Sequence, residues 1–360
     1  MHLKSLTLLN FRSWQNQKFG FHPQTTVIIG PNASGKTNIL EAIWFLISGT
    51  SFRAEKTSEV IRWQENQTQI KAIVEDEGTK EIGLTLIWEN KKRVKKSFLL
   101  NKQPQTRKNF LENLHGVVFR PEDIRLIAGS PSSRRQFLDQ LLFGLDWQYF
   151  QAWHHYFKAL KQRNRLLYQL RQKGNSFALK PANFSEFYYW DQSLIKNSAI
   201  LIEKRRNLIE SLNLFLTKED FKSFAGIELD YQPCPISPQL LKKTFRQDLN
   251  QGFTSLGPQK DDFRFLARCF PSLTNDLAAF GSRGQQRLAV FALKLAEMEF
   301  VFQQTKKLPL ILLDDIFSEL DRANHQLLLK LKLENQIILT TTHQALAVDY
   351  QKTIVLPGKI

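Results

Sequence analysis

A short glycine-rich segment constrains this sequence more than any other feature. Residues 30–37 read GPNASGKT, which satisfies the pattern G-x-x-x-x-G-K-[ST]. The segment directly follows a β-branched run, Thr25–Ile29, and precedes an apolar stretch with helical spacing, Ile39–Ile47. A strand, a glycine-rich loop and a helix in this order are typical of the phosphate-binding loop of nucleotide-binding proteins. The sequence therefore predicts an α/β fold with a bound nucleotide.

Each part of this loop has a physical role in holding phosphate. Glycines let backbone N–H groups wrap around the phosphate oxygens, and the helix N-terminus adds the positive end of its dipole. Lys36 is expected to reach the terminal phosphates and Thr37 to hold Mg²⁺. The predicted cofactor-binding residues of the loop are Gly30, Pro31, Asn32, Ala33, Ser34, Gly35, Lys36 and Thr37.

A phosphate-binding loop needs an acidic partner, and LILLDD at 310–315 supplies an apolar strand that ends in two carboxylates. Asp314 is expected to share Mg²⁺ with Thr37. Asp315 is placed to polarise a water molecule for attack on the γ-phosphate, which favours ATP hydrolysis over transfer to a metabolite. Asp314 lies 278 residues after Lys36, so a large insertion separates two segments that must be neighbours in one sheet.

The distribution of strand-like and helical patterns along the chain agrees with such an insertion. Strand-like patterns cover residues 3–9, 25–29, 70–74, 82–88 and 94–100, and they return only at 310–313 and 337–339. From Pro121 onward helical spacing predominates, as at 137–145 and 201–212. We expect residues 1–115 and 305–360 to form an ATPase lobe and residues 116–304 to form a mainly helical lobe.

A second anion site is predicted just before a buried helix at 288–302. Residues 282–286 read SRGQQ, and a serine cap with a glycine at a helix N-terminus suits phosphate. The chain has one phosphate-binding loop, so this second site is expected to serve the nucleotide of a partner copy. An ordinary capped helix is the alternative interpretation.

The charge of the chain predicts a polyanionic partner, either nucleic acid or an acidic membrane face. The chain carries 50 Lys and Arg against 34 Asp and Glu, a net charge of +16. Residues 91–108 and 147–185 are basic and contain no acid, and aromatic residues are interleaved in the second tract. The candidate DNA contacts are Lys91, Lys92, Arg93, Lys95, Lys96, Lys158, Lys161, Arg163 and Arg165. The alternative is a solvated helical face above core aromatics.

The cysteine content and the lengths of the apolar runs indicate the cellular compartment. Cys234 and Cys269 cannot form a disulfide framework or a zinc cluster, which favours a reducing cytoplasm. No apolar run approaches the roughly 18 residues of a membrane helix.

Six segments together resemble the RecF family of bacterial DNA repair proteins, which are SMC-like, ABC-type ATPases. They are LTLLNFRSW at 6–14, GPNASGKT, FRPEDIRLIAGSPSSRRQFLD at 119–139, GSRGQQR at 281–287, LILLDDIFSELD at 310–321 and TTTH at 340–343. The resemblance spans the whole chain. It implies an ABC-type P-loop ATPase head with an inserted, mainly helical second lobe and a short helical arm.

The resemblance also implies roles for individual residues. Residues 282–286 would be the signature motif, in which Ser282, Gly284 and Gln285 contact ATP, and Ser318–Asp321 would be the D-loop. His343 would be the switch histidine and act in catalysis with Asp315. Arg12 would approach the nucleotide, and Glu122 would lie near the segment that links ATP to the helical lobe.

One motif departs from the family pattern. Where the family has G-P-H-R-D-D, residues 257–262 read GPQKDD, so the histidine is replaced by Gln259 and the arginine by Lys260. The charge persists, but acid–base work at this position is lost. We therefore expect a structural or contact role for Gln259.

The resemblance implies a function as well: an ATP-driven, head-to-head homodimer that binds DNA at single-stranded gaps. RecR, RecO and RecA are the implied partners, in recombinational repair, replication recovery and the SOS response, and the ATPase would be weak. Two other classes share some motifs. A transporter ATPase is disfavoured by the basic charge, by SRGQQ and by Asp315, and a small-molecule kinase leaves the signature and His343 without a role.

Overall fold

The computed structural model describes residues 1–90, 92–173, 181–217, 226–267, 276–316, 335–342 and 351–357. The chain divides into two compact units. The first comprises Met1–Asp123 and Glu297–Ile360, and the second comprises Ile124–Ala296. The boundaries expected from the sequence, after residue 115 and before residue 305, assign less of the chain to the first unit. The difference is strand β8 (Gly116–Phe119), the residues up to Asp123 and the end of helix α9 (Arg283–Thr305).

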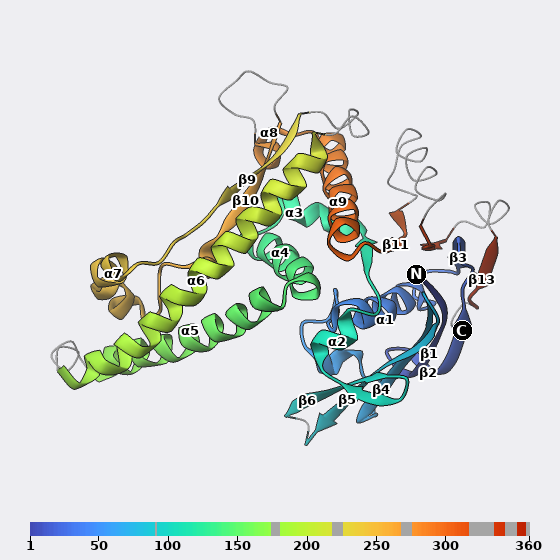
Figure 1. Ribbon diagram of the computed structural model, residues 1–360, viewed down its shortest axis with the longest axis horizontal. Helices are drawn as coiled ribbons and strands as arrows, with labels where there is room; N and C mark the ends of the chain where they lie inside the picture. The colour runs from blue at the N-terminus through green and yellow to red at the C-terminus, as the bar shows by residue number, and fades with distance from the viewer. Residues whose placement is uncertain are drawn as a thin grey trace. The chain divides into compact units, whose positions relative to one another are not determined.

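A six-stranded antiparallel sheet forms one layer of the first unit (Figure 1). Its strand order is β2-β1-β4-β5-β6-β7. The strands are β1 (His2–Phe11), β2 (Trp14–Gly20), β4 (Gln67–Glu75), β5 (Thr79–Glu89), β6 (Arg93–Leu100) and β7 (Gln103–Gln105). Buried and more exposed positions alternate along β4, so one face of this sheet is packed and the other faces outward.

A five-stranded parallel sheet forms the second layer, in the order β13-β3-β12-β11-β8. The strands not yet given are β3 (Thr25–Ile29), β11 (Leu310–Asp314), β12 (Ile337–Thr341) and β13 (Lys352–Val355). Every residue of β3, β11 and β12 is buried, as their unbroken apolar or β-branched sequences predict. Because the strands are parallel, the ends of β3 and β11 meet at the same edge of the sheet.

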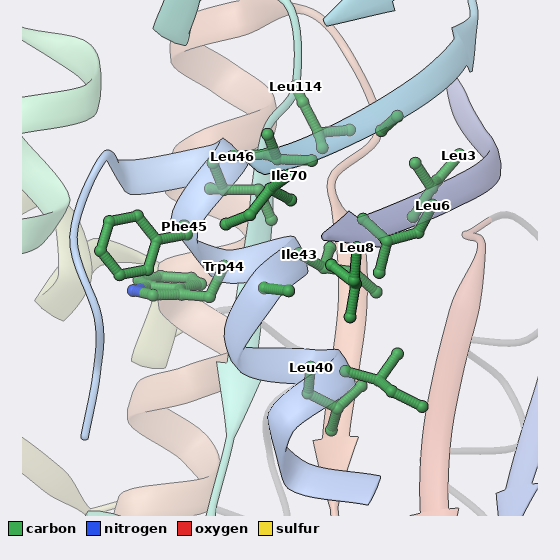
Figure 2. Close-up of a cluster of buried hydrophobic side chains, with 14 of the residues drawn as sticks. Leu3, Leu6, Leu8, Leu40, Ile43, Trp44, Phe45, Leu46, Ile70 and Leu114 are labelled. Carbon is green, nitrogen blue, oxygen red and sulfur yellow. The ribbon is translucent and has the colours of Figure 1, made fainter. Parts of the chain in front are cut away.

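Helix α1 (Lys36–Ser48) lies at the centre of the core of the first unit. Leu40 and Ile43 of α1 pack with Leu8 and other side chains of the antiparallel sheet (Figure 2). The same cluster contains Leu312 of the parallel sheet. Every residue from 39 to 47 is buried, so the helix contacts both sheets.

The second unit is mainly helical. Its helices are α3 (Arg125–Ala128), α4 (Pro131–Leu145), α5 (Trp147–Lys173), α6 (Pro181–Leu216), α7 (Pro238–Gln251), α8 (Leu277–Phe280) and the first part of α9. Helices α5 and α6 run side by side as a long pair (Figure 1). The second unit also contains the short helix η4 (Pro258–Lys260), and the first contains α2 (Arg107–Leu111), η1 (Thr57–Val60) and most of η2 (Pro121–Ile124). Across the part of the chain that the structure describes, no helix is long and apolar enough to cross a membrane.

The second unit also contains two strands that the sequence pattern did not predict. Strands β9 (Ile227–Gln232) and β10 (Asp262–Ala267) pair antiparallel. Phe263 and Phe265 are buried while Arg264 between them is exposed, which is strand alternation. The alternation lasts six residues and includes charges. It is therefore too short to stand out in a helical lobe, and the expectation that strands return only at 310–313 and 337–339 is wrong.

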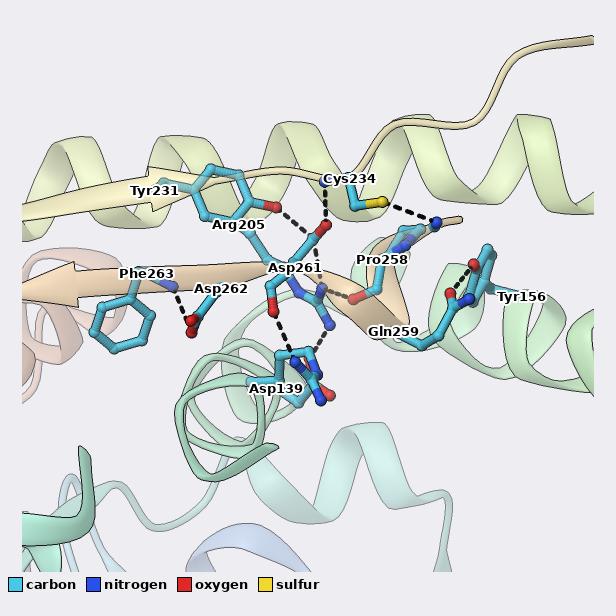
Figure 3. Close-up of polar contacts among 12 residues, drawn as sticks. Asp139, Tyr156, Arg205, Tyr231, Cys234, Pro258, Gln259, Asp261, Asp262 and Phe263 are labelled. Atoms are coloured by element: carbon cyan, nitrogen blue, oxygen red, sulfur yellow. Dashed lines mark hydrogen bonds and ion pairs between the residues drawn. The ribbon is translucent and has the colours of Figure 1, made fainter. Parts of the chain in front are cut away.

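A buried ionic network joins the long helices to the β9–β10 pair (Figure 3). Arg205 of α6 has no exposed side-chain surface and donates to Asp139 of α4 at 2.8 Å and to Asp261 at 2.7 Å. Asp261 also accepts from the Tyr231 hydroxyl at 2.6 Å, and Arg205 donates to the Pro258 carbonyl at 2.8 Å. Buried charges are tolerated only when they are paired and hydrogen-bonded, as here.

The expected α/β fold class is confirmed. Strands occupy all the segments predicted for them, and the predicted helical segments lie in α1, α4, α6 and α9.

Candidate nucleotide-binding site

The glycine-rich loop connects the end of β3 to the start of α1 and has the backbone geometry that its sequence predicts. Gly35 has a φ of 97° and Ala33 a φ of 63°. A Cβ atom on Gly35 would lie 2.9 Å from the Trp14 ring and 3.1 Å from the Ser13 hydroxyl. Glycine is therefore required at position 35 both for its left-handed backbone and for its close approach to Trp14.

The polar side chains of the loop converge on its interior. The Lys36 ammonium is buried and donates to the carbonyls of Gly30 at 2.8 Å and of Pro31 at 3.1 Å. The Ser34 hydroxyl is buried and forms no hydrogen bond within the described residues. A buried donor without a partner is unfavourable unless a ligand satisfies it. The loop therefore offers a cation, a free hydroxyl and a helix N-terminus, which fit the phosphates of a nucleotide.

The acidic strand meets this loop. The Asp314 carboxylate at the end of β11 accepts from the Thr37 hydroxyl at 3.0 Å and from the Thr340 hydroxyl of β12 at 2.8 Å. Thr37 and Asp314 are 277 residues apart in the chain. The parallel sheet thus brings together the two side chains that the sequence selects as Mg²⁺ ligands.

Burial raises the pKa of Asp314, and the nearby Asp315 and Glu122 raise it further, while the two threonine hydroxyls oppose them. A carboxylate in this setting is stabilised by a cation. Within the described ranges, no group of three or more His, Cys, Asp or Glu side chains could hold a metal alone. A magnesium ion at Thr37 and Asp314 would therefore complete its six oxygen ligands from phosphate and water, as is usual for this ion.

Asp315 adopts a left-handed backbone conformation, which is uncommon for residues other than glycine. Its φ is 48°, and its N–H donates to the Thr340 hydroxyl at 3.0 Å. Non-glycine residues in the left-handed region carry strain that surrounding contacts must hold in place. Thr340 therefore orients both acids of the pair, a role that sequence reasoning missed. His343 and the segment 318–321 lie outside the described residues.

Arg12 lies in the turn between β1 and β2 and contacts helix α1. Its guanidinium donates to both carboxylate oxygens of Glu41, at 2.7 and 2.9 Å, and Glu41 has no exposed surface. Arg12 also donates to the Glu59 carbonyl at 2.8 Å. Arg12 thus ties the turn after β1 to helix α1, and its expected approach to the nucleotide stays a prediction. The signal that was missed is Glu41, an acid within the apolar stretch 39–47.

The predicted signature residues form a cap at the start of α9, in the second unit. The Ser282 N–H donates to the Gln285 side chain at 2.8 Å, and the Gln285 N–H donates to the Ser282 hydroxyl at 3.3 Å. This reciprocal pattern is a capping box. Ser282, Gly284 and Gln285 are all exposed, and a Cβ on Gly284 would meet no atom closer than 3.9 Å. The surface at this helix end is therefore accessible.

In the first basic tract, most of the described candidate cations are exposed, but one of them is used in a contact within the fold. Lys92, Arg93 and Lys95 are exposed, and Lys91 lies outside the described residues. Lys96 instead donates to the Gly49 carbonyl at the end of α1, at 2.8 Å. Burial lowers the pKa of Lys96 to about 8, with a further contribution from the charge of Arg107. Lys96 therefore caps the helix that follows the loop, and its expected role in DNA binding is not supported.

In the second basic tract, the prediction for Arg163 is wrong. Lys158, Lys161 and Arg165 are exposed on α5. Arg163 has no exposed surface and is paired with Asp191 at 2.7 Å and with Asp248 at 2.8 Å, so it cannot reach DNA. The sequence held the signal, because position 163 falls on the buried stripe of α5 formed by residues 156, 160, 163, 167 and 170.

Gln259 has the structural role that its replacement of histidine suggested. Its side-chain oxygen accepts from the Tyr156 hydroxyl, and its amide donates to the Leu256 carbonyl at 2.8 Å (Figure 3). The first contact holds the segment before β10 against α5, and the second closes a turn within that segment.

Comparisons with known proteins agree with this geometry. Residues 2–356 match the family described as the RecF/RecN/SMC N terminal domain. The DNA replication and repair protein RecF of Natranaerobius thermophilus is 35% identical over 353 residues, which cover 92% of this chain and 88% of that protein. RecF of Lachnoclostridium phytofermentans is 35% identical over 349 residues, covering 95% and 93% of the two chains.

A solved structure entitled "Structure of the recombination mediator protein RecF-ATP in RecFOR pathway" has a similar fold. Its TM-score is 0.81 at 29% identity, and the match covers 97% of this chain and 93% of that one. The similarity therefore extends over both units and includes the helical insertion. The chain belongs to the RecF family of SMC-like, ABC-type ATPases.

Proposed function

We propose that this chain is an ATP-binding protein of DNA replication and repair, in which ATP controls an assembly that holds DNA. The observation that carries the proposal is the hydrogen bond between Thr37 and Asp314, with the unpaired Ser34 hydroxyl beside it. The names of the RecF relatives, and the RecF-ATP structure, support the choice of ATP and of DNA repair.

In this proposal the loop residues bind and orient the phosphates of ATP. Lys36 contacts the terminal phosphate oxygens, and the Ser34 hydroxyl donates a hydrogen bond to a phosphate oxygen. Thr37 and Asp314 would hold Mg²⁺, which supplies positive charge next to the phosphate oxygens. Asp315 orients the attacking water and accepts its proton, and His343 assists at the γ-phosphate.

Hydrolysis is expected to be slow. Asp315 is one methylene shorter than the glutamate found in many related ATPases, and a small misplacement of the attacking water is costly in rate. ATP then acts mainly as a switch, and its hydrolysis releases the assembled state.

The assembly is a head-to-head homodimer. Ser282, Gly284 and Gln285 of one copy cover the ATP held by the loop of the other, because they are exposed at the N-terminus of a 23-residue helix whose dipole favours phosphate. ATP drives dimerisation only if it binds the dimer more tightly than it binds the monomer.

DNA contacts the exposed cations of the two basic tracts, namely Lys92, Arg93, Lys95, Lys158, Lys161 and Arg165. Such contacts are to phosphate, so binding is strongly salt-dependent and largely independent of base sequence. RecR, RecO and RecA are the proposed partners at single-stranded gaps, in recombinational repair, replication recovery and the SOS response.

Lys36→Ala tests this proposal at its first step. Loss of the ammonium should weaken binding of a fluorescent ATP analogue by at least about a hundredfold, since hydrogen bonds to charged groups are among the strongest in a site. ATP should also increase the affinity of the wild-type protein for gapped DNA and leave that of Lys36→Ala unchanged. The proposal is wrong if Lys36→Ala binds the analogue as the wild type does, or if ATP leaves wild-type DNA binding unchanged.

A further inference from the structure

Two exposed aromatic rings on the second unit have no role in the nucleotide site. Tyr168 on α5 is 56% exposed, and Phe253, just after α7, is 43% exposed. The segment that carries Phe253 lies against α5 near Tyr168: a Cβ on the preceding Gly252 would lie 3.8 Å from the Tyr168 ring, and the following Thr254 donates to Asn164 of α5. Gly252 itself has a φ of 79° and turns the chain so that Phe253 follows directly beside α5.

Cations flank both rings. The Lys260 ammonium lies 5.8 Å from the centre of the Phe253 ring. Arg171 is exposed, and one of its guanidinium nitrogens donates to the Gln251 carbonyl at 3.3 Å. Neither α5 nor the segment 251–260 contains an Asp or Glu residue. We call Tyr168, Arg171, Phe253 and Lys260 the aromatic patch.

The aromatic patch is held rigidly from below. Thr254 donates through its N–H and its hydroxyl to the Asn164 side chain, at 2.8 and 2.7 Å. The N–H groups of Gly252 and Phe253 both donate to the Asp248 carbonyl, at 2.7 and 3.2 Å. A surface that is already ordered loses little conformational entropy when it binds a ligand.

The patch continues into the exposed basic face of α5. Lys161 and Arg165 precede Tyr168 by seven and three residues, so they project from the same side of the helix. A row of cations that leads to exposed ring faces matches the arrangement that binds single strands, in which phosphates follow the charges and bases stack on the rings.

We propose that the aromatic patch binds unpaired bases of single-stranded DNA. In a duplex both faces of each base are already stacked, so exposed rings can bind only bases that are free of a partner strand. Tyr168 and Phe253 provide the stacking surfaces, and Arg171 and Lys260 contact the neighbouring phosphates. This inference rests on the proposed function in DNA repair, and assigns the single-stranded part of a gap to this patch.

The test compares two probes, oligo(dT) and a blunt duplex of the same length, by fluorescence anisotropy with the full chain. Tyr168→Ala and Phe253→Ala should each weaken oligo(dT) binding by about tenfold, the amount expected for one lost stack, and should change duplex binding less than about twofold. Tyr168→Phe and Phe253→Tyr keep a ring and should bind oligo(dT) like the wild type. Trp63→Ala, which removes an 87% exposed ring from the first unit, is the matched control and should leave oligo(dT) binding unchanged.

Three outcomes would overturn the inference. If the alanine variants bind oligo(dT) and the duplex with equally reduced affinity, the patch does not distinguish single strands from duplex DNA. If the alanine variants bind both probes with the affinity of the wild type, DNA does not contact the rings. A protein partner is then the better occupant of the patch, and the proposed function stands. If the wild-type chain binds neither probe with or without ATP, the proposed function fails and this inference fails with it.

Discussion

Thr340 illustrates how one buried hydroxyl organises the acidic side of the site. It donates to Asp314 at 2.8 Å and accepts from the N–H of Asp315 at 3.0 Å, and it is fully buried. Because both acids depend on it, its removal should affect the binding of ATP with Mg²⁺ as well as stability.

Thr340→Val should lower the free energy of unfolding by about 1–3 kcal/mol, because it removes the acceptor for the Asp315 N–H and one of the two hydroxyls that donate to Asp314. The affinity for ATP should fall in the presence of Mg²⁺ and change little without it. Thr25→Val is the matched control in neighbouring strand β3, since the buried Thr25 hydroxyl forms no hydrogen bond within the described residues and should be replaceable without loss. Denaturant unfolding and analogue binding measure both effects. Equal losses in the two variants would contradict the role of Thr340.

Asp314 is expected to decrease the stability of the protein at neutral pH, because folding buries its negative charge. Its pKa is raised above the ordinary value of 3.8, chiefly by burial. A group whose pKa is raised by folding stabilises the folded state below the ordinary value, and that contribution is lost as the pH rises through the raised pKa.

Asp314→Asn should therefore unfold at a higher denaturant concentration than the wild type at pH 7. The advantage should shrink as the pH falls toward 3.8, where the wild-type carboxyl is protonated. The variant should at the same time lose Mg²⁺-dependent ATP binding. Denaturant unfolding across this pH range makes the measurement, and an advantage that is constant with pH would show that desolvation of the charge is not the cause.

At the scale of elements, helix α5 has two faces with different tasks. Its buried face carries Arg163, which joins α5 to α6 and α7 through Asp191 and Asp248. Its exposed face carries Lys161 and Arg165. Arg163 therefore contributes to stability, whereas Lys161 and Arg165, each two residues away, are available to bind DNA.

Arg163→Met should destabilise the second unit by about 3–5 kcal/mol, because it leaves the fully buried Asp248 carboxylate without the positive charge that it pairs with. Lys161→Met should change stability by less than about 0.5 kcal/mol, but it should weaken DNA binding and reduce the slope of log affinity against log salt by about one. Thermal unfolding and salt titration of DNA binding separate the two. A folded Arg163→Met protein with a reduced salt slope would restore the arginine as a DNA contact.

The sequence predicts elements with strong patterns and fails where a pattern is short or a contact is tertiary. The loop at 30–37 and strand β11 were found because an apolar run and a motif coincide there. The strands β9 and β10 were missed because they are short and charged. The pairing of Arg12 with Glu41, and of Thr340 with both acids, joins residues far apart in the chain, so no local pattern could reveal it.

At the scale of the whole molecule, the proposed assembly contains two copies of the chain. The loop and the acids lie in the first unit, and the exposed cap formed by Ser282 and Gln285 lies in the second. The cap has an accessible surface and a favourable dipole for phosphate, as the proposed dimer requires of the surface that covers the nucleotide of the other copy.

The mass of the protein in solution tests whether ATP assembles the proposed dimer on DNA. Light scattering with ATP and Mg²⁺ should give twice the 42.0 kDa mass of the chain, and the dimer should be retained on duplex DNA that carries a single-stranded gap. Asp315→Asn should keep ATP bound and hold the dimer longer, whereas Lys36→Ala should stay monomeric. A mass of one chain that ATP and gapped DNA leave unchanged would contradict the account.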